Sequence, residues 1–279
     1  MKIAVLSGKG GTGKTFISTN LANAIGKCKY IDCDVEEPNG AIFLKGNIAS
    51  DNSVNVLIPN INLEKCNSCR KCVDFCKFNA IAFLNDKPVI FKNICHSCGG
   101  CKLVCDQNAI SEQEYCIGKI YHSKCKDIDV YTGKLNVGET SGNPIIKEMM
   151  KELKYNDDDI VIIDCPPGAA CSTMESISYA DKCIIVVEPT IFGFENFKMV
   201  YELVKVMNKP VSVIINRNME NNCNIEEFCK ENNIDIISYI NYDKTIANSI
   251  SEGELVTDIS DKYRKIFKDI IYKIGGIPI

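Results

Sequence analysis

Cysteine is the residue whose spacing in this sequence most directly indicates chemistry. The 279-residue chain has 17 cysteines, and eight of them lie between positions 66 and 105. These eight form two runs of the pattern C-x-x-C-x-x-C-x-x-x-C, and the two segments match at a shift of 29 residues (66 to 95). Thiolates bind iron well, and this spacing is typical of [4Fe–4S] ligands. The internal repeat therefore predicts two such clusters.

The two runs have the spacing of bacterial ferredoxins, in which the fourth cysteine of each run binds the other cluster. We therefore expect one cluster to be held by Cys66, Cys69, Cys72 and Cys105. We expect the second to be held by Cys95, Cys98, Cys101 and Cys76. A pair of zinc sites is the competing interpretation, but zinc sites rarely need this run in duplicate. Lys77 and Asp106 directly follow the fourth cysteine of each run, a position at which ferredoxins usually have proline.

A glycine-rich segment near the N-terminus has the pattern of a phosphate-binding loop. Residues 8–15 fit G-x-x-x-x-G-K-[ST], between an apolar run and a helical pattern. Backbone N–H groups of such a loop bind phosphate oxygens. We expect Lys14 to contact the β- and γ-phosphates and the Thr15 hydroxyl to bind Mg²⁺. The whole predicted nucleotide-binding loop is Gly8, Lys9, Gly10, Gly11, Thr12, Gly13, Lys14 and Thr15.

Carboxylates follow two further apolar runs. Asp32 and Asp34 end the segment 30–34, and Asp164 follows Ile160–Ile163, shortly before Gly168. Hydrolysis of a phosphoanhydride needs an oriented water and a positioned Mg²⁺, which such carboxylates can supply. Gly168 allows a backbone N–H to approach the γ-phosphate. The alternative is that Asp32 and Asp34 only cap the loop that follows their strand.

Lys9, a second lysine directly after the first glycine, resembles the deviant Walker A motif of the MinD/ParA/Mrp and nitrogenase iron-protein superfamily. The resemblance implies that Lys9 crosses the interface of an ATP-dependent homodimer. It also implies that Asp34 positions the attacking water, with Asp32 beside it, and that Asp164 belongs to a Walker B motif. Catalytic roles thus fall to Lys9, Lys14, Asp34 and Asp164. Near the adenine the resemblance places Glu188, Asn216 and Arg217.

The apolar runs alternate with amphipathic segments. Strands are predicted at Ile3–Leu6, Tyr30–Ile31, Ile160–Ile163, Cys183–Val187 and Val211–Ile215. Helices are predicted at Thr15–Ile25, Asn143–Leu153 and Asn196–Met207. This rhythm predicts an α/β P-loop NTPase with a mostly parallel sheet and helices on both faces. We expect a small α+β, bacterial-ferredoxin-like domain to be inserted at 58–111, which divides the ATPase domain into 1–57 and 112–279.

Composition limits the environment and the partners. The net charge of −4 offers no basic excess, so no nucleic-acid partner is expected. Neither a signal peptide nor an apolar run of membrane-spanning length is present, so we expect a cytoplasmic protein with reduced thiols. The amphipathic segment Lys262–Ile274 is expected to be a last helix that covers the sheet. Membrane contact by that helix is the alternative.

The whole chain is similar to MinD-superfamily ATPases that carry an inserted ferredoxin domain. The resemblance implies an ATP-hydrolysing, Mg²⁺-dependent iron–sulfur protein that couples nucleotide state to electron transfer, or to iron–sulfur or metallocofactor assembly on a client protein. Two alternatives stay open: a MinD/ParA-like positioning ATPase with structural or sensory clusters, and a ferredoxin-type electron carrier with a regulatory nucleotide site. Cys171, after Gly168, is considered as a ligand that bridges two protomers, but is expected to be a buried small residue.

Overall fold

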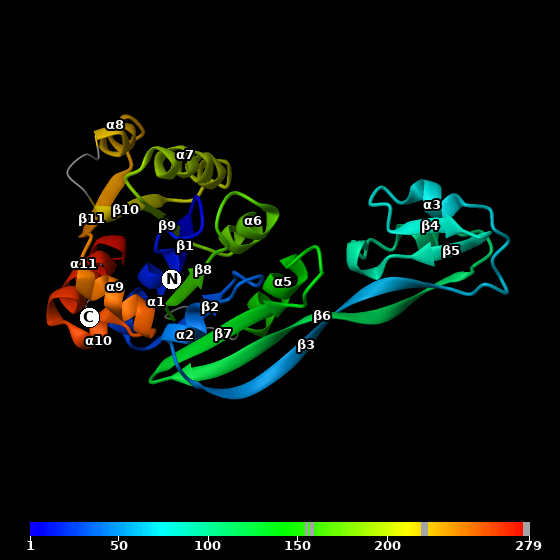
Figure 1. Ribbon diagram of the computed structural model, residues 1–279, viewed down its shortest axis with the longest axis horizontal. Coiled ribbons are helices and arrows are strands. Elements are labelled where there is room, and N and C mark those ends of the chain that lie inside the picture. The colour runs from blue at the N-terminus through cyan, green and yellow to red at the C-terminus, as the bar shows by residue number, and fades with distance from the viewer. Residues whose placement is uncertain (154–155, 157–158, 219–222, 276–279) are drawn as a thin grey trace.

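The computed structural model describes residues 1–279 except 154–155, 157–158, 219–222 and 276–279. The predicted range 112–279 includes these positions, which lie outside the described residues. The chain forms a large α/β body and a smaller cysteine-rich lobe, and two long strands connect them (Figure 1). The nucleotide-binding pattern lies in the body and both cysteine runs lie in the lobe.

The body is built on a sheet that has nine strands within the described residues, in the order β11-β10-β9-β1-β8-β2-β7-β6-β3. The strands from β11 to β7 are parallel to one another, whereas β6 is antiparallel to both of its neighbours, β7 and β3. The parallel strands are β1 (Lys2–Ser7), β2 (Cys28–Asp32), β7 (Ile128–Leu135), β8 (Val161–Asp164), β9 (Lys182–Val187), β10 (Val211–Asn218) and β11 (Asp235–Asn241). The mostly parallel sheet is therefore confirmed. The central strands have short apolar sequences because both of their faces are buried.

Two strands that the sequence did not predict form the outer edge of the sheet. β3 (Asn47–Ile61) and β6 (Ile110–Cys125) pair along nearly their whole length. β6 also pairs with β7 between Gly118 and Cys125, so that part belongs to the body. Beyond Gly118 the two strands continue as a two-stranded ribbon toward the lobe (Figure 1). The expected domain limits at 58 and 111 fall inside these strands.

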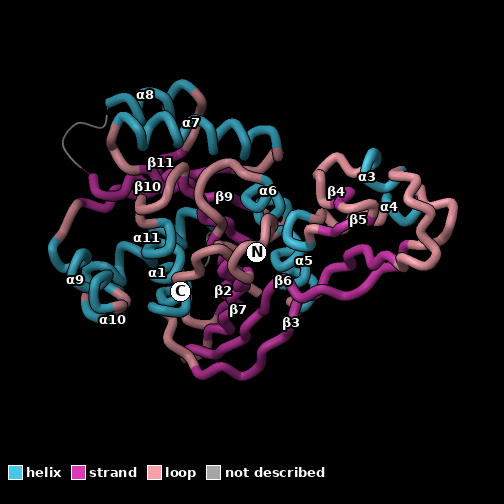
Figure 2. The backbone as a smooth tube through the Cα atoms, turned by 45° about the vertical axis from the view of Figure 1, so that its right-hand side comes forward, coloured by secondary structure: helices cyan, strands magenta, loops and turns pink. Residues whose placement is uncertain are grey.

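Helices cover both faces of the sheet, as predicted (Figure 2). One face is packed by α1 (Lys14–Ile25), α2 (Gly40–Phe43), α9 (Lys244–Glu252), α10 (Val256–Ile259) and α11 (Asp261–Gly275). The other is packed by α5 (Asn143–Glu152), α6 (Cys171–Ser178), α7 (Ile191–Val206) and α8 (Cys223–Glu231). α7 begins five residues before the predicted start because Thr190 caps it, accepting the N–H of Gly193.

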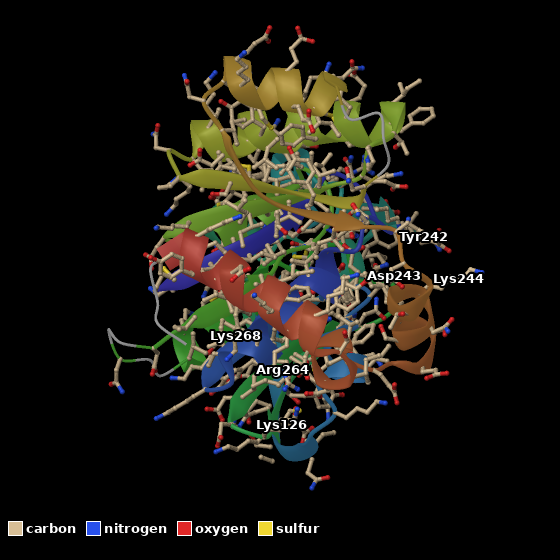
Figure 3. All side chains as sticks on the ribbon, turned by 90° about the vertical axis from the view of Figure 1, so that its left-hand side faces the viewer. Lys126, Tyr242, Asp243, Lys244, Arg264 and Lys268 are labelled. Atoms are coloured by element: carbon tan, nitrogen blue, oxygen red, sulfur yellow. The ribbon has the colours of Figure 1, made fainter. Side chains whose placement is uncertain are left out.

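The C-terminal helix α11 is the covering helix that the sequence predicts. Its buried side includes Tyr263, Phe267 and Ile271, which pack into the core shared with α1. Basic residues such as Arg264 and Lys268 lie on its outer side (Figure 3). Within the described residues, no helix has the length and apolar character needed to cross a membrane. The apolar stripe of α11 is thus used inside the protein.

The lobe contains short elements and a small core. Its elements are α3 (Lys71–Phe75), β4 (Ile81–Leu84), β5 (Lys87–Ile90), a 3₁₀ turn (Lys92–Ile94) and α4 (Gly100–Leu103). Only Ile81, Cys101 and Ile110 form its buried apolar cluster among the described residues. The sequence repeat is also a repeat of backbone conformation. Left-handed residues recur 29 positions apart, at Ser68 and Ser97, Arg70 and Gly99, and Asn79 and Asn108.

Candidate functional site

The glycine-rich loop connects β1 to α1, at the carboxyl edge of the parallel strands. Its last glycine, Gly13, has a φ of 92°, and a Cβ there would lie 2.2 Å from Nδ2 of Asn216. Only glycine combines this conformation with this close approach. Lys14 follows as the first residue of α1, so the helix N-terminus and the lysine face the same cavity.

Lys14 is the centre of a buried charge network. Its Nζ lies 2.5 Å from Oδ1 of Asp164 and 3.9 Å from Oδ2 of Asp34. The Tyr30 hydroxyl donates to Oδ2 of Asp164 over 2.8 Å. Asp164 is fully buried, so its charge depends on these two partners. The structure therefore brings together three residues that the sequence assigned to the site and adds a fourth, Tyr30.

The pKa values of Asp32 and Asp34 are raised, as expected for closely spaced buried acids. Burial first, and then the neighbouring Asp164, raise the pKa of Asp32 to about 7 against the attraction of Lys14. Burial likewise raises the pKa of Asp34 to about 6. Burial alone would lower the pKa of Lys14, but Asp164, Asp32 and Asp34 outweigh it and raise the pKa. In this arrangement the lysine can bind phosphate oxygens, and the carboxylates can bind a divalent ion.

A cavity of about 880 Å³ adjoins this network and is large enough for a nucleotide. The loop and α1 contribute Gly10, Gly11, Gly13, Lys14 and Thr15 to its lining. The segment after β2 contributes Asp34 and Val35, and the segment after β8 contributes Pro166 and Pro167. Lys14, Thr15 and Asp34 of the predicted site thus share one cavity, whereas Asp32, Asp164 and Gly168 are not part of its lining.

Five predicted residues make contacts within the protein that differ from their expected contacts with nucleotide. Glu188 lies 3.3 Å from the Lys9 ammonium and 3.5 Å from the Arg217 guanidinium, so it bridges both cations. Asn216 donates through Nδ2 to the Thr12 carbonyl over 2.7 Å and thus supports the loop. The Gly168 N–H donates to the Ser7 carbonyl over 2.8 Å, so it must exchange this partner before it can bind a phosphate.

Tyr30 is the site residue that the motifs missed. It lies at 0% exposure in β2, two residues before Asp32, and its hydroxyl also lies 3.2 Å from Oγ of Ser18 in α1. No nucleotide-binding pattern includes a tyrosine at this place. The only signal in the sequence is a polar-tipped aromatic residue in a strand that ends in a candidate carboxylate.

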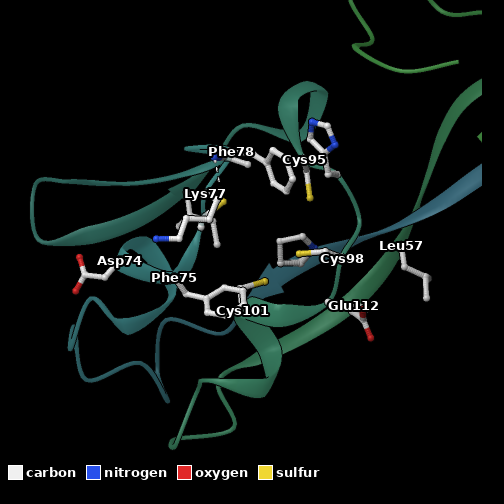
Figure 4. Close-up of a pocket in the computed structure, with 15 residues that line it drawn as sticks. Leu57, Asp74, Phe75, Lys77, Phe78, Cys95, Cys98, Cys101 and Glu112 are labelled. Carbon is white, nitrogen blue, oxygen red and sulfur yellow. Dashed lines mark hydrogen bonds between the residues drawn. The ribbon is translucent and has the colours of Figure 1, made fainter. Parts of the chain in front are cut away.

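The eight lobe cysteines divide between two cavities. One is narrow, about 20 Å³, and its lining includes Cys66, Cys69, Cys72 and Cys105. The other is about 480 Å³, and its lining includes Cys76, Cys95, Cys98 and Cys101 (Figure 4). Each cavity thus receives three cysteines from one repeat and the fourth cysteine of the other.

Backbone N–H groups point at the two exchanged sulfurs. The Ala80 N–H donates to Sγ of Cys76 over 3.3 Å, and the Ala109 N–H donates to Sγ of Cys105 over 3.4 Å. These positions are again 29 residues apart. Burial raises the pKa of the Cys101 thiol to about 11. The two halves of the lobe therefore present their cysteines in equivalent ways.

Two findings limit the assignment of metals. Within the described part of the chain, no three or more His, Cys, Asp or Glu side chains are arranged around a single metal ion. Every cysteine whose side chain is described is free of disulfides.

The expectation that Cys171 is buried is wrong. It is exposed because it opens α6 at the surface, directly after the turn at Gly168.

Together the parallel sheet, the loop between β1 and α1 and the buried lysine–carboxylate network define a P-loop nucleotide-binding protein of the α/β class. Residues 3–256 match the family described as the CobQ/CobB/MinD/ParA nucleotide binding domain, and the chain belongs to this family.

Individual relatives agree over nearly the full length. An uncharacterised protein of Methanocaldococcus jannaschii is 31% identical over 94% of this chain and 93% of its own. The septum site-determining protein MinD of Bacillus subtilis is 23% identical over 98% of this chain and 88% of its own. The structure of MinD from Pyrococcus horikoshii, complexed with Mg-ADP, covers 99% of this chain and 96% of its own at 19% identity, with a TM-score of 0.61.

These similarities confirm the family and the MinD-like fold. They fit the MinD/ParA-like ATPase of the alternative hypothesis better than an iron–sulfur electron carrier. The inserted ferredoxin-like domain and its clusters stay predictions, because neither the family match nor the relatives described above bear on them.

Proposed function

We propose that the chain is a Mg²⁺-dependent ATPase whose lobe holds two [4Fe–4S] clusters. Its nucleotide state would control electron transfer by the clusters, or cluster and metallocofactor delivery to a client protein. The observation that carries this proposal is the exchange of Cys76 and Cys105 between the two cysteine cavities. A two-cluster ferredoxin requires this exchange, whereas two independent zinc sites would each use cysteines of one repeat.

The lobe's other properties support the same cofactor. A cubane cluster has four irons that each take one thiolate, so its ligands surround a volume and need not converge on one ion. The N–H groups of Ala80 and Ala109 can stabilise the charge on ligating sulfur. With a buried apolar cluster of only Ile81, Cys101 and Ile110 in its described residues, the lobe has little hydrophobic stabilisation of its own. Small domains of this kind usually depend on metals or disulfides.

For the nucleotide half, each role follows from position. Lys14 would leave Asp164 to bind the β- and γ-phosphates, and Asp34, at the cavity wall, would orient the attacking water. Thr15 and Asp164 would hold Mg²⁺, which, when bound, neutralises phosphate charge. Lys9, 37% exposed, would leave Glu188 and reach the nucleotide of a second protomer in an ATP-dependent homodimer.

Contacts between the body and the lobe support the proposed coupling. The Val35 carbonyl, one residue after Asp34, accepts the N–H of Leu135 at the end of β7. The loop that follows packs Gly142 against the Val35 side chain, and its Thr140 donates to the Asn93 carbonyl in the lobe over 3.1 Å. A continuous set of contacts thus runs from the switch carboxylate to the cysteine lobe. Movement of Val35 on ATP binding would therefore shift Thr140 and its hydrogen-bond partner Asn93.

The test uses the full chain, reconstituted anaerobically with iron and sulfide. About eight irons per chain are expected, and the cluster potentials should differ between Mg-ADP and a non-hydrolysable ATP analogue. Thr140→Val removes the contact with Asn93 and should reduce that difference, whereas Ser178→Ala, on the exposed end of α6, should not. Iron bound at fewer than about four atoms per chain would refute the clusters. Equal potentials in both nucleotide states would refute the coupling alone.

The MinD/ParA-like positioning ATPase is the second candidate, because the comparisons favour it. It predicts ATP-dependent localisation in cells that persists in the double variant Cys76→Ala, Cys105→Ala. A plain electron carrier with a regulatory nucleotide site is distinguished by Lys14→Ala, which would then keep its electron-transfer activity. Loss of client reduction or cluster delivery in both variants supports the proposed function over both alternatives.

A further inference from the structure

A groove of about 640 Å³ lies on the far side of α2 from the nucleotide cavity. Its walls are the segment Ala41–Ile48 on one side and β6 and β7 on the other, with Tyr121, Ser123, Lys124, Thr132 and Lys134 in its lining. The next residues of α2, Ile42 and Phe43, line the nucleotide cavity. The two cavities therefore share α2 as a wall.

The floor of the groove contains two buried hydroxyl groups, those of Ser123 and Thr132. Ser123 and Thr132 are only 8% and 9% exposed, and neither hydroxyl makes a hydrogen bond within the described part of the chain. Tyr121 lies directly across from Thr132 in the β6–β7 pair and lines the same groove. Buried hydroxyls are normally hydrogen-bonded, so a polar ligand in the groove would satisfy them.

The charge at the groove is positive. Lys134 is exposed, lies on the same face of the β6–β7 pair as Tyr121, Ser123 and Thr132, and forms no ion pair with any described residue. Lys124 lies across from Asp129 on the other face, and Asp51 of β3 is paired with Lys119 over 2.6 Å. Lys45 lies at the rim, with its ammonium toward Gly253 at the end of α9. No aspartate or glutamate is among the described residues that line the groove.

We propose that this groove is a second anion site, which binds the phosphate group of a small molecule. The Lys134 ammonium would neutralise the phosphate, and the hydroxyls of Ser123 and Thr132 would donate to its oxygens. Buried hydroxyls at the base of a groove favour a discrete phosphate over a polymer lying across the surface. The site is independent of the lobe and of any cluster in it.

The position of the groove links it to the nucleotide site. Thr132 is the cross-strand neighbour of Asp32 in the β2–β7 pair. Asp32 in turn accepts the N–H of Gly40, the first residue of α2, over 2.8 Å. A ligand that fixes Thr132 and the segment after α2 therefore acts on two neighbours of Asp32, Thr132 and Gly40. Bound phosphate should change the affinity for nucleotide, and nucleotide should change the affinity for phosphate by the same factor.

The experiment titrates the full chain, loaded with one equivalent of Mg-ADP to fill the P-loop, with inorganic phosphate or glycerol 3-phosphate, followed by ³¹P NMR and calorimetry. Lys134→Gln should weaken binding about tenfold or more, and Thr132→Val, which removes one hydroxyl at constant shape, should also weaken it. Lys205→Gln, on the exposed face of α7, serves as the matched control and should bind like the unchanged protein.

The two probes separate the two sources of phosphate. Tighter binding of glycerol 3-phosphate identifies a phosphate ester as the ligand, and tighter binding of inorganic phosphate identifies the free ion. Either result supports the site if Lys134→Gln weakens it. Absence of binding to both probes, or equal binding by Lys134→Gln and the unchanged protein, would overturn the proposal. Lysine-dependent binding of a DNA oligonucleotide without binding of either small probe would also overturn it, in favour of a polymer.

Discussion

The Tyr30 hydroxyl supports the buried charge of Asp164, and Tyr30→Phe removes this support without changing the shape of the ring. The hydroxyl donates to Asp164 over 2.8 Å at a fully buried position, where water cannot replace it. Ser18, the other neighbour, keeps its hydrogen bond to the Thr15 carbonyl at 3.1 Å. The substitution therefore leaves one buried carboxylate oxygen without a donor.

The expected magnitude follows from that single lost hydrogen bond. A hydrogen bond to a charged group contributes about 1.5–3 kcal/mol. A loss of about 2 kcal/mol raises the unfolding equilibrium constant about 30-fold. For a domain of this size it lowers the melting temperature by roughly 4–8 °C. Mg-nucleotide affinity should fall as well, because Asp164 is also the proposed Mg²⁺-side carboxylate.

The assay is urea and thermal unfolding of the nucleotide-free protein, in which Lys14 stays on Asp164. Tyr272→Phe is the matched control, since Tyr272 is 67% exposed in α11, and it should change the unfolding free energy by less than about 0.5 kcal/mol. An equally small change for Tyr30→Phe would show that the hydroxyl does not stabilise Asp164, and the reasoning about this network would fail.

Three further predictions test other parts of the site. Cys76→Ala should remove about four of the eight irons and spare the cluster that Cys105 completes, with Cys116→Ala as the control; loss of none or of all of the iron would contradict two separate four-iron clusters. The pKa of Asp32, about 7 in the folded protein against about 3.9 unfolded, means that stability falls as pH rises between these values. Urea unfolding should therefore show Asp32→Asn more favourable, relative to the unchanged protein, at pH 8 than at pH 5, and an equal difference at both would refute it. Glu188→Gln releases Lys9 and should strengthen ATP-analogue-dependent dimers by up to about fivefold in sedimentation, whereas weaker dimers would contradict the bridge.

The parts of the fold that the sequence predicts are those with local causes. Ile160–Ile163 reads as a buried strand because both faces of β8 are covered, and Gly13 is required by its own backbone conformation. The strands β3 and β6 could not be predicted in this way. They carry many polar residues, and their paired residues are separated in the sequence by the whole lobe, as Ile61 and Ile110 are, so the partner cannot be identified from either strand alone.

The site shows the same division. Lys14 and Asp164 could be identified from motifs, because phosphate and Mg²⁺ chemistry fixes their type and spacing. Their direct contact, 150 positions apart in the sequence, depends on β1 and β8 being neighbours in the sheet. Tyr30 and the groove hydroxyls of Ser123 and Thr132 have no motif at all. Their significance arises only from burial without partners or beside a charge, which is a property of packing.

The two-stranded part of the β3–β6 ribbon sets the mechanics of the molecule. Five residue pairs, from Leu57–Glu114 to Ile61–Ile110, extend beyond the part of the ribbon that packs against the body core at Val56 and Tyr115. At about 3.4 Å per residue this is an arm of about 17 Å, and a change of about 10° at its base moves its far end by about 3 Å. In the proposed two-cluster protein, a small rotation near Val35 would change the distance between the lobe and an electron-transfer partner. The ribbon would then act as a lever that converts a small rotation at its base into a larger displacement of the lobe.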